Sequence, residues 1–236
     1  GDVSDWLAAG GTLEGLDELA RGARPKPPTI SATELMALDL APPRWAVPDL
    51  IPEGLSFLAA PPKAGKSWLA LSACVAVACG GAVLGAVQVE RGESLYLALE
   101  DSQRRVRDRL RVLLDGVAVP DGLHVATEWA RLDAGGVERL DGWLTEHPAC
   151  RLVVIDTLAR VRPPRKRGED PYQGDSEAVA PLQRLAHHHG VAILLIHHLR
   201  KQDRRAAETD PLEAVSGTMG LTAVADAVLV LRRGRF

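Results

Sequence analysis

The 236-residue sequence predicts an α/β fold, with a mostly parallel central sheet flanked by helices. From Gly54 onward, short apolar runs alternate with helical stretches. The runs are continuous rather than alternating, which is typical of strands covered on both faces. An apolar fraction of 46% and a charged fraction of 25% also fit a globular chain, so they exclude wholesale disorder and a bundle of membrane helices.

The predicted strands share a short apolar core that ends at polar or turn-forming residues. They are residues 55–59, 94–99, 124–127, 151–155, 191–196 and 227–231. The stretches between them have helical patterns at residues 66–79, 102–114, 136–146 and 176–188. The second of these helices is strongly charged, with Val106, Leu110 and Leu113 on one face, as expected of a helix that packs on a sheet.

The first 44 residues are organised differently. Two short helical patterns, at residues 4–19 and 31–38, are separated by a proline-rich linker at residues 24–28. Ser31 and Glu34 have the spacing of a capping box, which predicts where the second helix begins. We therefore divide the chain into a linker or docking segment, residues 1–44, and a single α/β domain, residues 45–236. Because the chain begins with Gly and ends in a basic stretch, we expect it to be part of a longer protein.

Composition also bears on the compartment. No run is apolar and long enough to span a bilayer, and the amino terminus lacks the pattern of a secretory signal. Cys74, Cys79 and Cys150 have no disulfide or metal-binding spacing, so we expect them to be core residues of a reduced protein. These features predict a cytoplasmic protein with no membrane partner.

Residues 60–67 have the spacing of the Walker A phosphate-binding loop, between the first predicted strand and the first long helix. Loop amides and the helix N-terminus attract a phosphate. Lys66 is expected to reach the β- and γ-phosphates, and the Ser67 hydroxyl to bind Mg²⁺. The predicted nucleotide-binding residues are Ala60, Pro61, Pro62, Lys63, Ala64, Gly65, Lys66, Ser67 and Trp68. Ala60 stands where the motif has Gly, and Lys63 is either a nucleotide or subunit contact or a solvated loop charge.

Two carboxylates complete the predicted chemistry. Asp156 ends the buried run 151–155 in the Walker B pattern, so we expect it to hold Mg²⁺ mainly through water, with Thr157 assisting. No Glu follows Asp156 directly. Glu100 ends another predicted strand, at the edge of the sheet where ligands bind in open α/β folds, and we predict that it is the base that activates water. Asp101 is more simply a helix cap or charge.

The strand at residues 191–196 ends in His197 and His198. Adjacent side chains in a strand point to opposite faces, so at most one of them faces the nucleotide. We predict that His198 hydrogen-bonds the γ-phosphate and reports its loss to the following loop. The predicted catalytic residues are therefore Glu100, Lys66 and His198. The histidines at 187–189 are explained by their place at a helix C-terminus.

These motifs resemble those of RecA-fold ATPases of the RepA-like hexameric helicase group. The resemblance covers about residues 45–231, through APPKAGKSWLAL, LYLALEDS, LVVIDTL, ILLIHHLRK and SGTMGLTAVADAVLVLRR. It implies a RecA-like P-loop NTPase fold, ATP and Mg²⁺ as cofactors, and a homo-oligomeric ring with nucleotide at the subunit interfaces. It also implies Glu100 as the base and His198 as the γ-phosphate sensor. Members of the group complete the site with a basic finger from the next subunit, for which the candidates are Arg200, Lys201, Arg232, Arg233 and Arg235.

The resemblance further implies that the loops after the Walker B and sensor strands face a DNA channel. Both loops are basic here, which favours salt-sensitive binding of a phosphate backbone. The first cluster begins at Arg160. The predicted DNA-binding residues are Arg162, Arg165, Lys166, Arg167, Arg200, Lys201, Arg204 and Arg205. Against this, both loops also hold acidic residues, and Tyr172 is the aromatic residue available for stacking.

The sequence therefore predicts a Mg-dependent ATPase that acts on single-stranded DNA as a helicase or translocase, in the replication of a plasmid, phage or integrated element. The alternative is a non-motor switch in regulation, repair or recombination, whose ring or filament binds partners without moving along DNA. A nucleotide kinase would need an acceptor pocket and lid arginines, and the helicase-like strand ends disfavour it.

Overall fold

The computed structural model describes residues 12, 29–40, 42–165, 168, 170–198 and 219–232. The chain divides into two compact units, Gly1–Pro42 and Pro43–Phe236. The first contains α3 (Ala32–Met36), where the Ser31 hydroxyl accepts the Glu34 amide (3.1 Å) and the Glu34 carboxylate accepts the Ser31 amide (2.9 Å). The capping box is thus confirmed. The helix predicted at residues 4–19 lies outside the described residues.

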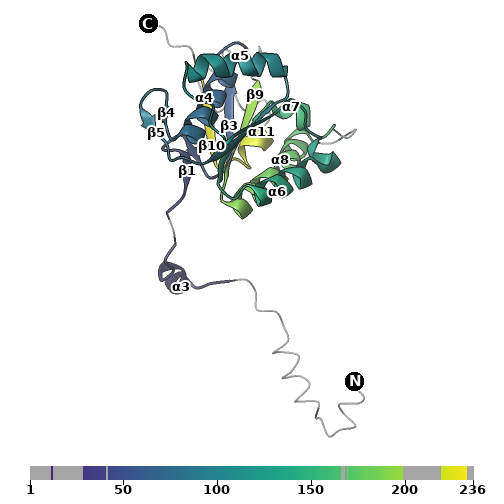
Figure 1. Cartoon of the computed structure of the whole chain (residues 1–236). Helices are drawn as coiled ribbons and strands as arrows, with labels where there is room; N and C mark the ends of the chain where they lie inside the picture. The colour runs from purple at the N-terminus through teal and green to yellow at the C-terminus, as the bar shows by residue number, and fades with distance from the viewer. Residues whose placement is uncertain are drawn as a thin grey trace. The chain divides into compact units, whose positions relative to one another are not determined.

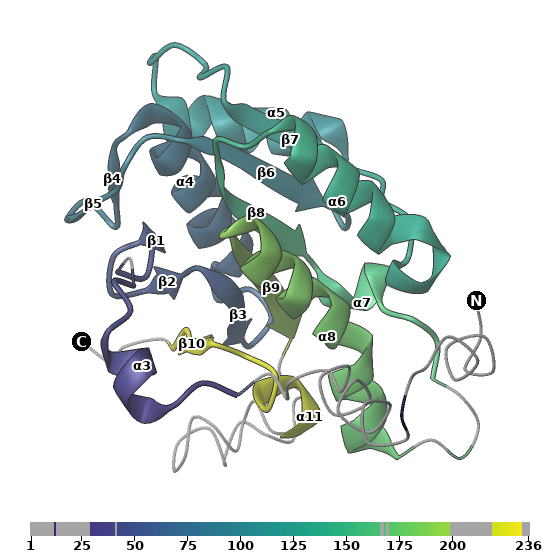
Figure 2. The same ribbon diagram turned by 90° about the horizontal axis from the view of Figure 1, so that it is seen from below.

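The second unit is built on a six-stranded sheet in the order β10-β3-β9-β8-β6-β7, with every pair parallel (Figures 1 and 2). The strands are β3 (Gly54–Ala60), β6 (Glu93–Ala98), β7 (Leu123–Ala126), β8 (Cys150–Asp156), β9 (Ala192–His198) and β10 (Ala227–Val230). Each overlaps a predicted run, and the predicted α/β fold with a parallel sheet is confirmed. Because all strands run the same way, their carboxyl ends lie along one edge.

Helices cover both faces of this sheet (Figure 1). One face packs against α4 (Lys66–Cys79) and α5 (Gln103–Leu114), the other against α6 (Val137–Glu146) and α8 (Pro171–His189). Strand β3 shows why its sequence is continuously apolar: Leu58 lies in the core on the α4 side, while Leu55 and Phe57 lie in the core on the α6 and α8 side.

Helix α8 begins before the predicted position, 176. Asp170 caps it by accepting the Gln173 amide (3.1 Å), and Pro171 occupies the first turn, where a missing amide donor costs nothing. The sequence signal for this start was present in Asp170 and Pro171. The apolar periodicity that predicted the helix begins only further along.

Several short elements were not predicted, because two to five residues are too few for a periodic pattern. They are β1 (Trp45–Val47), β2 (Ile51–Pro52), β4 (Ala82–Val83), β5 (Val87–Gln88), the kinked turn η1 (Leu132–Gly136), α7 (Leu158–Val161) and α11 (Met219–Thr222). The β4–β5 hairpin projects from the body of this unit, and α11 lies against α8 (Figure 2).

The cysteines correct one expectation. Cys74 and Cys150 are buried thiols, as predicted, but Cys79 is exposed. It is the last residue of α4, next to the C-cap Gly80, where the helix has reached the surface. Burial raises the pKa of the Cys150 thiol to about 12. Among the described residues, every helix is too short or too polar to cross a membrane.

Candidate nucleotide-binding and hydrolysis site

The phosphate-binding loop connects β3 to α4. Ala60 is a fully buried residue of β3 with strand backbone, so the motif's missing Gly is tolerated there. The left-handed backbone falls instead on Lys63 (φ 62°) and on Gly65 (φ 99°), where the absence of a Cβ removes the steric cost. Gly65 is the N-cap of α4, and no side chain caps this end. The amides of the first turn are therefore available to an anion.

Lys66 is where the loop and the two predicted carboxylates meet. Its Nζ donates to the carbonyl oxygens of Ala60 (2.7 Å) and Pro61 (3.0 Å). Burial lowers the pKa of Lys66 below its ordinary value, and the negative charges of Asp156 and Glu100 partly oppose this shift. Both carboxylates are thus near enough to act electrostatically on the lysine.

Asp156 is held by a residue that was not predicted. It ends β8 with 4% of its surface exposed, and its Oδ2 accepts a 2.6 Å hydrogen bond from the hydroxyl of Tyr96 on β6. Burial, with the Asp156 charge, raises the pKa of Tyr96 well above its ordinary value, so the hydroxyl remains a donor. A tyrosine in an apolar strand needs a polar partner when buried, and this was the available signal.

Glu100 lies in the turn after β6, beside the residue that follows Asp156. The Leu99 amide donates to the Asp156 carbonyl (2.7 Å), which holds the turn against β8. The buried Thr157 donates from Oγ1 to Oε1 of Glu100 (2.9 Å), and Arg160 Nε lies 4.0 Å from the same oxygen. Thr157 was predicted to assist the metal; here it contacts the predicted base. The peptide bond between Asp156 and Thr157 is cis.

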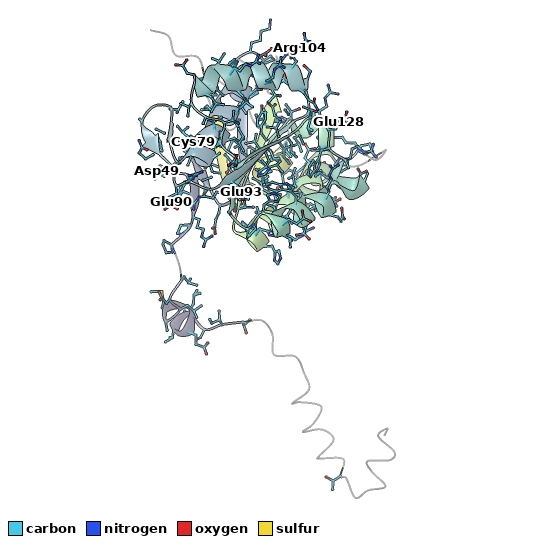
Figure 3. All side chains as sticks on the ribbon, in the orientation of Figure 1. Asp49, Cys79, Glu90, Glu93, Arg104 and Glu128 are labelled. Atoms are coloured by element: carbon cyan, nitrogen blue, oxygen red, sulfur yellow. The ribbon has the colours of Figure 1, made fainter. Side chains whose placement is uncertain are left out.

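Trp68 extends the loop region toward α5. It is 40% exposed, and the Arg109 guanidinium lies 5.7 Å from its ring centroid. Asp101 fixes this arginine at 2.5 Å and also pairs with Arg105. The cap of α5 is Ser102 rather than Asp101, so Asp101 acts as a charge partner within the helix. Trp68 and three arginines line a groove of about 520 Å³ beside the loop, with Arg104 among them (Figure 3).

The sheet register places His198 beside the loop. In the β3–β9 pair, Ala59 lies opposite His197 and Ala60 opposite His198, so the backbone of His198 adjoins the first residue of the phosphate-binding loop. The side chain of His198 lies outside the described part of the structure, and its sensor role stays a prediction.

The first basic cluster has an internal partner. Arg162 and Arg165 both pair with Asp175, a fully buried residue of α8; Arg165 Nη2 lies 3.0 Å from Oδ1. Arg160 is 61% exposed. Outside the described residues lie Lys166, Arg167, Arg200, Lys201, Arg204 and Arg205, together with the finger candidates Arg233 and Arg235; Arg232, the remaining finger candidate, is exposed.

The donor set fits Mg²⁺. The half-buried Ser67 supplies a hydroxyl at the start of α4, and Asp156 supplies a buried carboxylate of which Oδ2 is already bonded to Tyr96. All these ligand atoms are oxygens, which Mg²⁺ prefers. Ser67 and Asp156 are thus the residues that would hold the ion.

A phosphate-binding loop after the first strand, with buried carboxylates at neighbouring strand ends, defines a P-loop ATPase of RecA-like fold. The chain belongs to the AAA domain family, whose model matches residues 22–204. Among solved structures it is similar to the ATPase domain of another protein, with a TM-score of 0.58 and 15% identity over 99% of this chain and 84% of that one. The predicted RecA-like fold and ATPase class are confirmed.

Proposed function

We propose that this ATPase requires Mg²⁺ and works as a RepA-like DNA helicase or translocase. It would assemble as a homo-oligomeric, hexameric ring in the cytoplasm and act in the replication of a plasmid, phage or integrated element. The observation that carries the proposal is the position of Glu100, whose partners Thr157 and Arg160 both come from the segment that follows the Walker B strand. That segment carries the first basic cluster.

In the proposed reaction, the loop amides and Lys66 bind the phosphates of ATP. Lys66 exchanges the carbonyls of Ala60 and Pro61 for phosphate oxygens, which offer a full negative charge. Mg²⁺, when bound, neutralises charge on the phosphates as it develops. Glu100 orients the attacking water and accepts its proton, while the hydrogen bond from Thr157 fixes the direction of its carboxylate.

Coupling to DNA would pass through Arg160. Its guanidinium is mostly exposed and lies near the Glu100 carboxylate. A DNA phosphate bound in this region competes with Glu100 for the arginine, so the base changes partners when DNA binds. Because the two binding events then share one residue, each changes the affinity for the other, as linkage requires.

One observation favours the alternative, a non-motor switch. Arg162 and Arg165 are both paired with the buried Asp175, so the first cluster offers DNA less free positive charge than its sequence suggests. A switch of this kind would hydrolyse ATP through the same residues and bind a partner without translocation.

The test is ATP hydrolysis with and without single-stranded DNA, over a salt series. A helicase shows stimulation and salt-dependent binding, and the absence of both would refute the helicase proposal and leave the switch. Glu100→Gln should lower hydrolysis by about 10²- to 10⁴-fold, the usual contribution of a general base, with ATP binding retained. Glu146→Gln, at an exposed site at the end of α6, is the matched control. Normal hydrolysis by Glu100→Gln would show that the base is another residue.

A further inference from the structure

A cluster of metal-ligand side chains lies at the other edge of the sheet from the phosphate-binding loop. Glu93 is the first residue of β6, His124 belongs to β7, and His147 is the C-cap of α6. Since β3 and β6 are parallel to the rest of the sheet, the loop is at the carboxyl edge and Glu93 at the amino edge. Figure 3 labels Glu93 and Glu90 together at this end of the sheet, away from Arg104 on α5.

The three side chains converge. One potential ligand atom from each lies within 4.8 Å of the other two. His124 Nε2 is 3.6 Å from Glu93 Oε2, and the ring centroids of His124 and His147 are 4.8 Å apart. Ligands at about 2.0 to 2.2 Å from a tetrahedral Zn²⁺ are separated by somewhat over 3 Å, so modest rotations of the side chains would close the site.

The His147 ring is held in the orientation that a ligand needs. Its Nδ1 lies 2.9 Å from the carbonyl oxygen of Trp143, and since a carbonyl only accepts, Nδ1 carries the proton. The Nε2 lone pair is then free for a metal, and a backbone carbonyl on the second ring nitrogen is the usual companion of a metal-bound histidine. Stacking on Trp143, at 4.0 Å between centroids and 11° between planes, restricts the ring further.

Glu93 supplies an independent indication. Its Oε2 is shielded from solvent and has no hydrogen-bond partner among the described residues. The nearby His124 Nε2 is beyond hydrogen-bonding distance. A buried carboxylate oxygen without a partner is costly, and a cation at this point would satisfy it.

We propose that Glu93, His124 and His147 bind one Zn²⁺ ion, with water as a fourth ligand. Two imidazoles and a carboxylate are a set that Zn²⁺ favours, whereas Mg²⁺ prefers oxygen ligands alone. The ion would tie the edge strand β7 and the end of α6 to the start of β6. This site is separate from the nucleotide site and does not depend on the proposed helicase function.

The test uses the whole chain, stripped with a chelator and then titrated with Zn²⁺ against a chromophoric competitor. We expect one tightly bound ion per chain, unaffected by excess Mg²⁺, and with Co²⁺ as a probe the strong visible absorption of a tetrahedral site. Glu93→Gln, His124→Gln and His147→Gln should each weaken binding by at least about tenfold, the lower end of the effect of losing even a supporting partner. Circular dichroism verifies that each variant is folded.

The histidine run at residues 187–189 supplies the control. His187 and His189 contact Asp226 and Asp141, and His188 is exposed. Replacing all three with Gln should leave Zn²⁺ binding unchanged. Loss of binding in this control variant, or unchanged affinity in the three cluster variants, would overturn the assignment. A wild-type chain with no Zn²⁺ affinity in the competition assay would overturn it whatever the variants do.

Discussion

Tyr96→Phe removes a single hydroxyl from the interior of the ATPase unit and leaves the ring in place. The hydroxyl donates the 2.6 Å hydrogen bond to Asp156 Oδ2, and Tyr96 is fully buried. The substitution therefore makes no large cavity, and its effect comes from the lost bond. Asp156 is left with one oxygen in a nearly closed environment and no tyrosine to orient it.

The expected loss of stability follows from that bond. A hydrogen bond to a charged group contributes roughly 1.5 to 3 kcal/mol. For a domain of this size, each kcal/mol lowers Tm by about 2 to 4 °C, so we expect a decrease of about 3 to 12 °C. Tyr172→Phe is the matched control, because Tyr172 is 46% exposed and a surface change of this kind stays within about 0.5 kcal/mol.

The functional readout is the Mg²⁺ dependence of ATP hydrolysis. Tyr96 orients a carboxylate that we assign to the ion, and loss of such an outer partner weakens metal affinity by about 10- to 100-fold. We therefore expect Tyr96→Phe to need correspondingly more Mg²⁺ for half-maximal hydrolysis, with much of the rate recovered at saturation. A lower Tm with an unchanged Mg²⁺ requirement would show that Tyr96 supports the fold alone. No change in either would refute the buried hydrogen bond.

Four further changes probe the surrounding structure. Thr157→Val removes the hydrogen bond to the proposed base and should slow ATP hydrolysis by about tenfold, the equivalent of 1.4 kcal/mol, with Thr157→Ser restoring the rate. Asp175→Asn breaks two ion pairs at a fully buried carboxylate and should lower the free energy of unfolding by about 3 to 5 kcal/mol in urea titrations; an unchanged midpoint would mean that the pairs do not stabilise the fold. Gly65→Ala places a Cβ at a positive φ, which costs about 1 to 2 kcal/mol, and should weaken ATP binding in nucleotide titrations, whereas Gly142→Ala in the exposed face of α6 should not. Because burial lowers the pKa of Lys66 in the folded state, the unfolded chain binds this proton more readily, so stability without nucleotide should rise with pH in the alkaline range below the ordinary lysine pKa; Lys66→Met should abolish that part of the rise in unfolding experiments.

The fold could be predicted largely because its strands are buried on both faces. A continuous run such as that of β8 leaves few alternatives, and α4 has the same bounds as its prediction. The elements that were missed are short or begin with a cap rather than with apolar periodicity, as α8 does at Asp170. Local signals fixed these starts, but their evidence lies in one or two residues.

The site divides in a similar way. The phosphate-binding loop is a contiguous motif, so its spacing alone identified Lys66 and Ser67. Tyr96 and Thr157 act through partners on other strands, and which partner each one meets depends on the register between β6 and β8, where Ala98 lies opposite Asp156. The Zn²⁺ cluster is more remote still, because its three residues come from separate elements with no motif spacing.

The central position of β8 explains why these contacts converge. It lies between β6 and β9, so its end receives Tyr96 and Glu100 from the β6 side. The chain then continues from the metal ligand, Asp156, through the partner of the base, Thr157, to the arginines that pair with Asp175 on α8. A displacement of this segment by DNA or another partner would move Thr157 relative to Glu100, because fewer than ten residues separate Thr157 from both arginines. The buried ion pairs resist such a displacement, so we expect the hydrolysis rate and the occupancy of these pairs to change together when a partner binds.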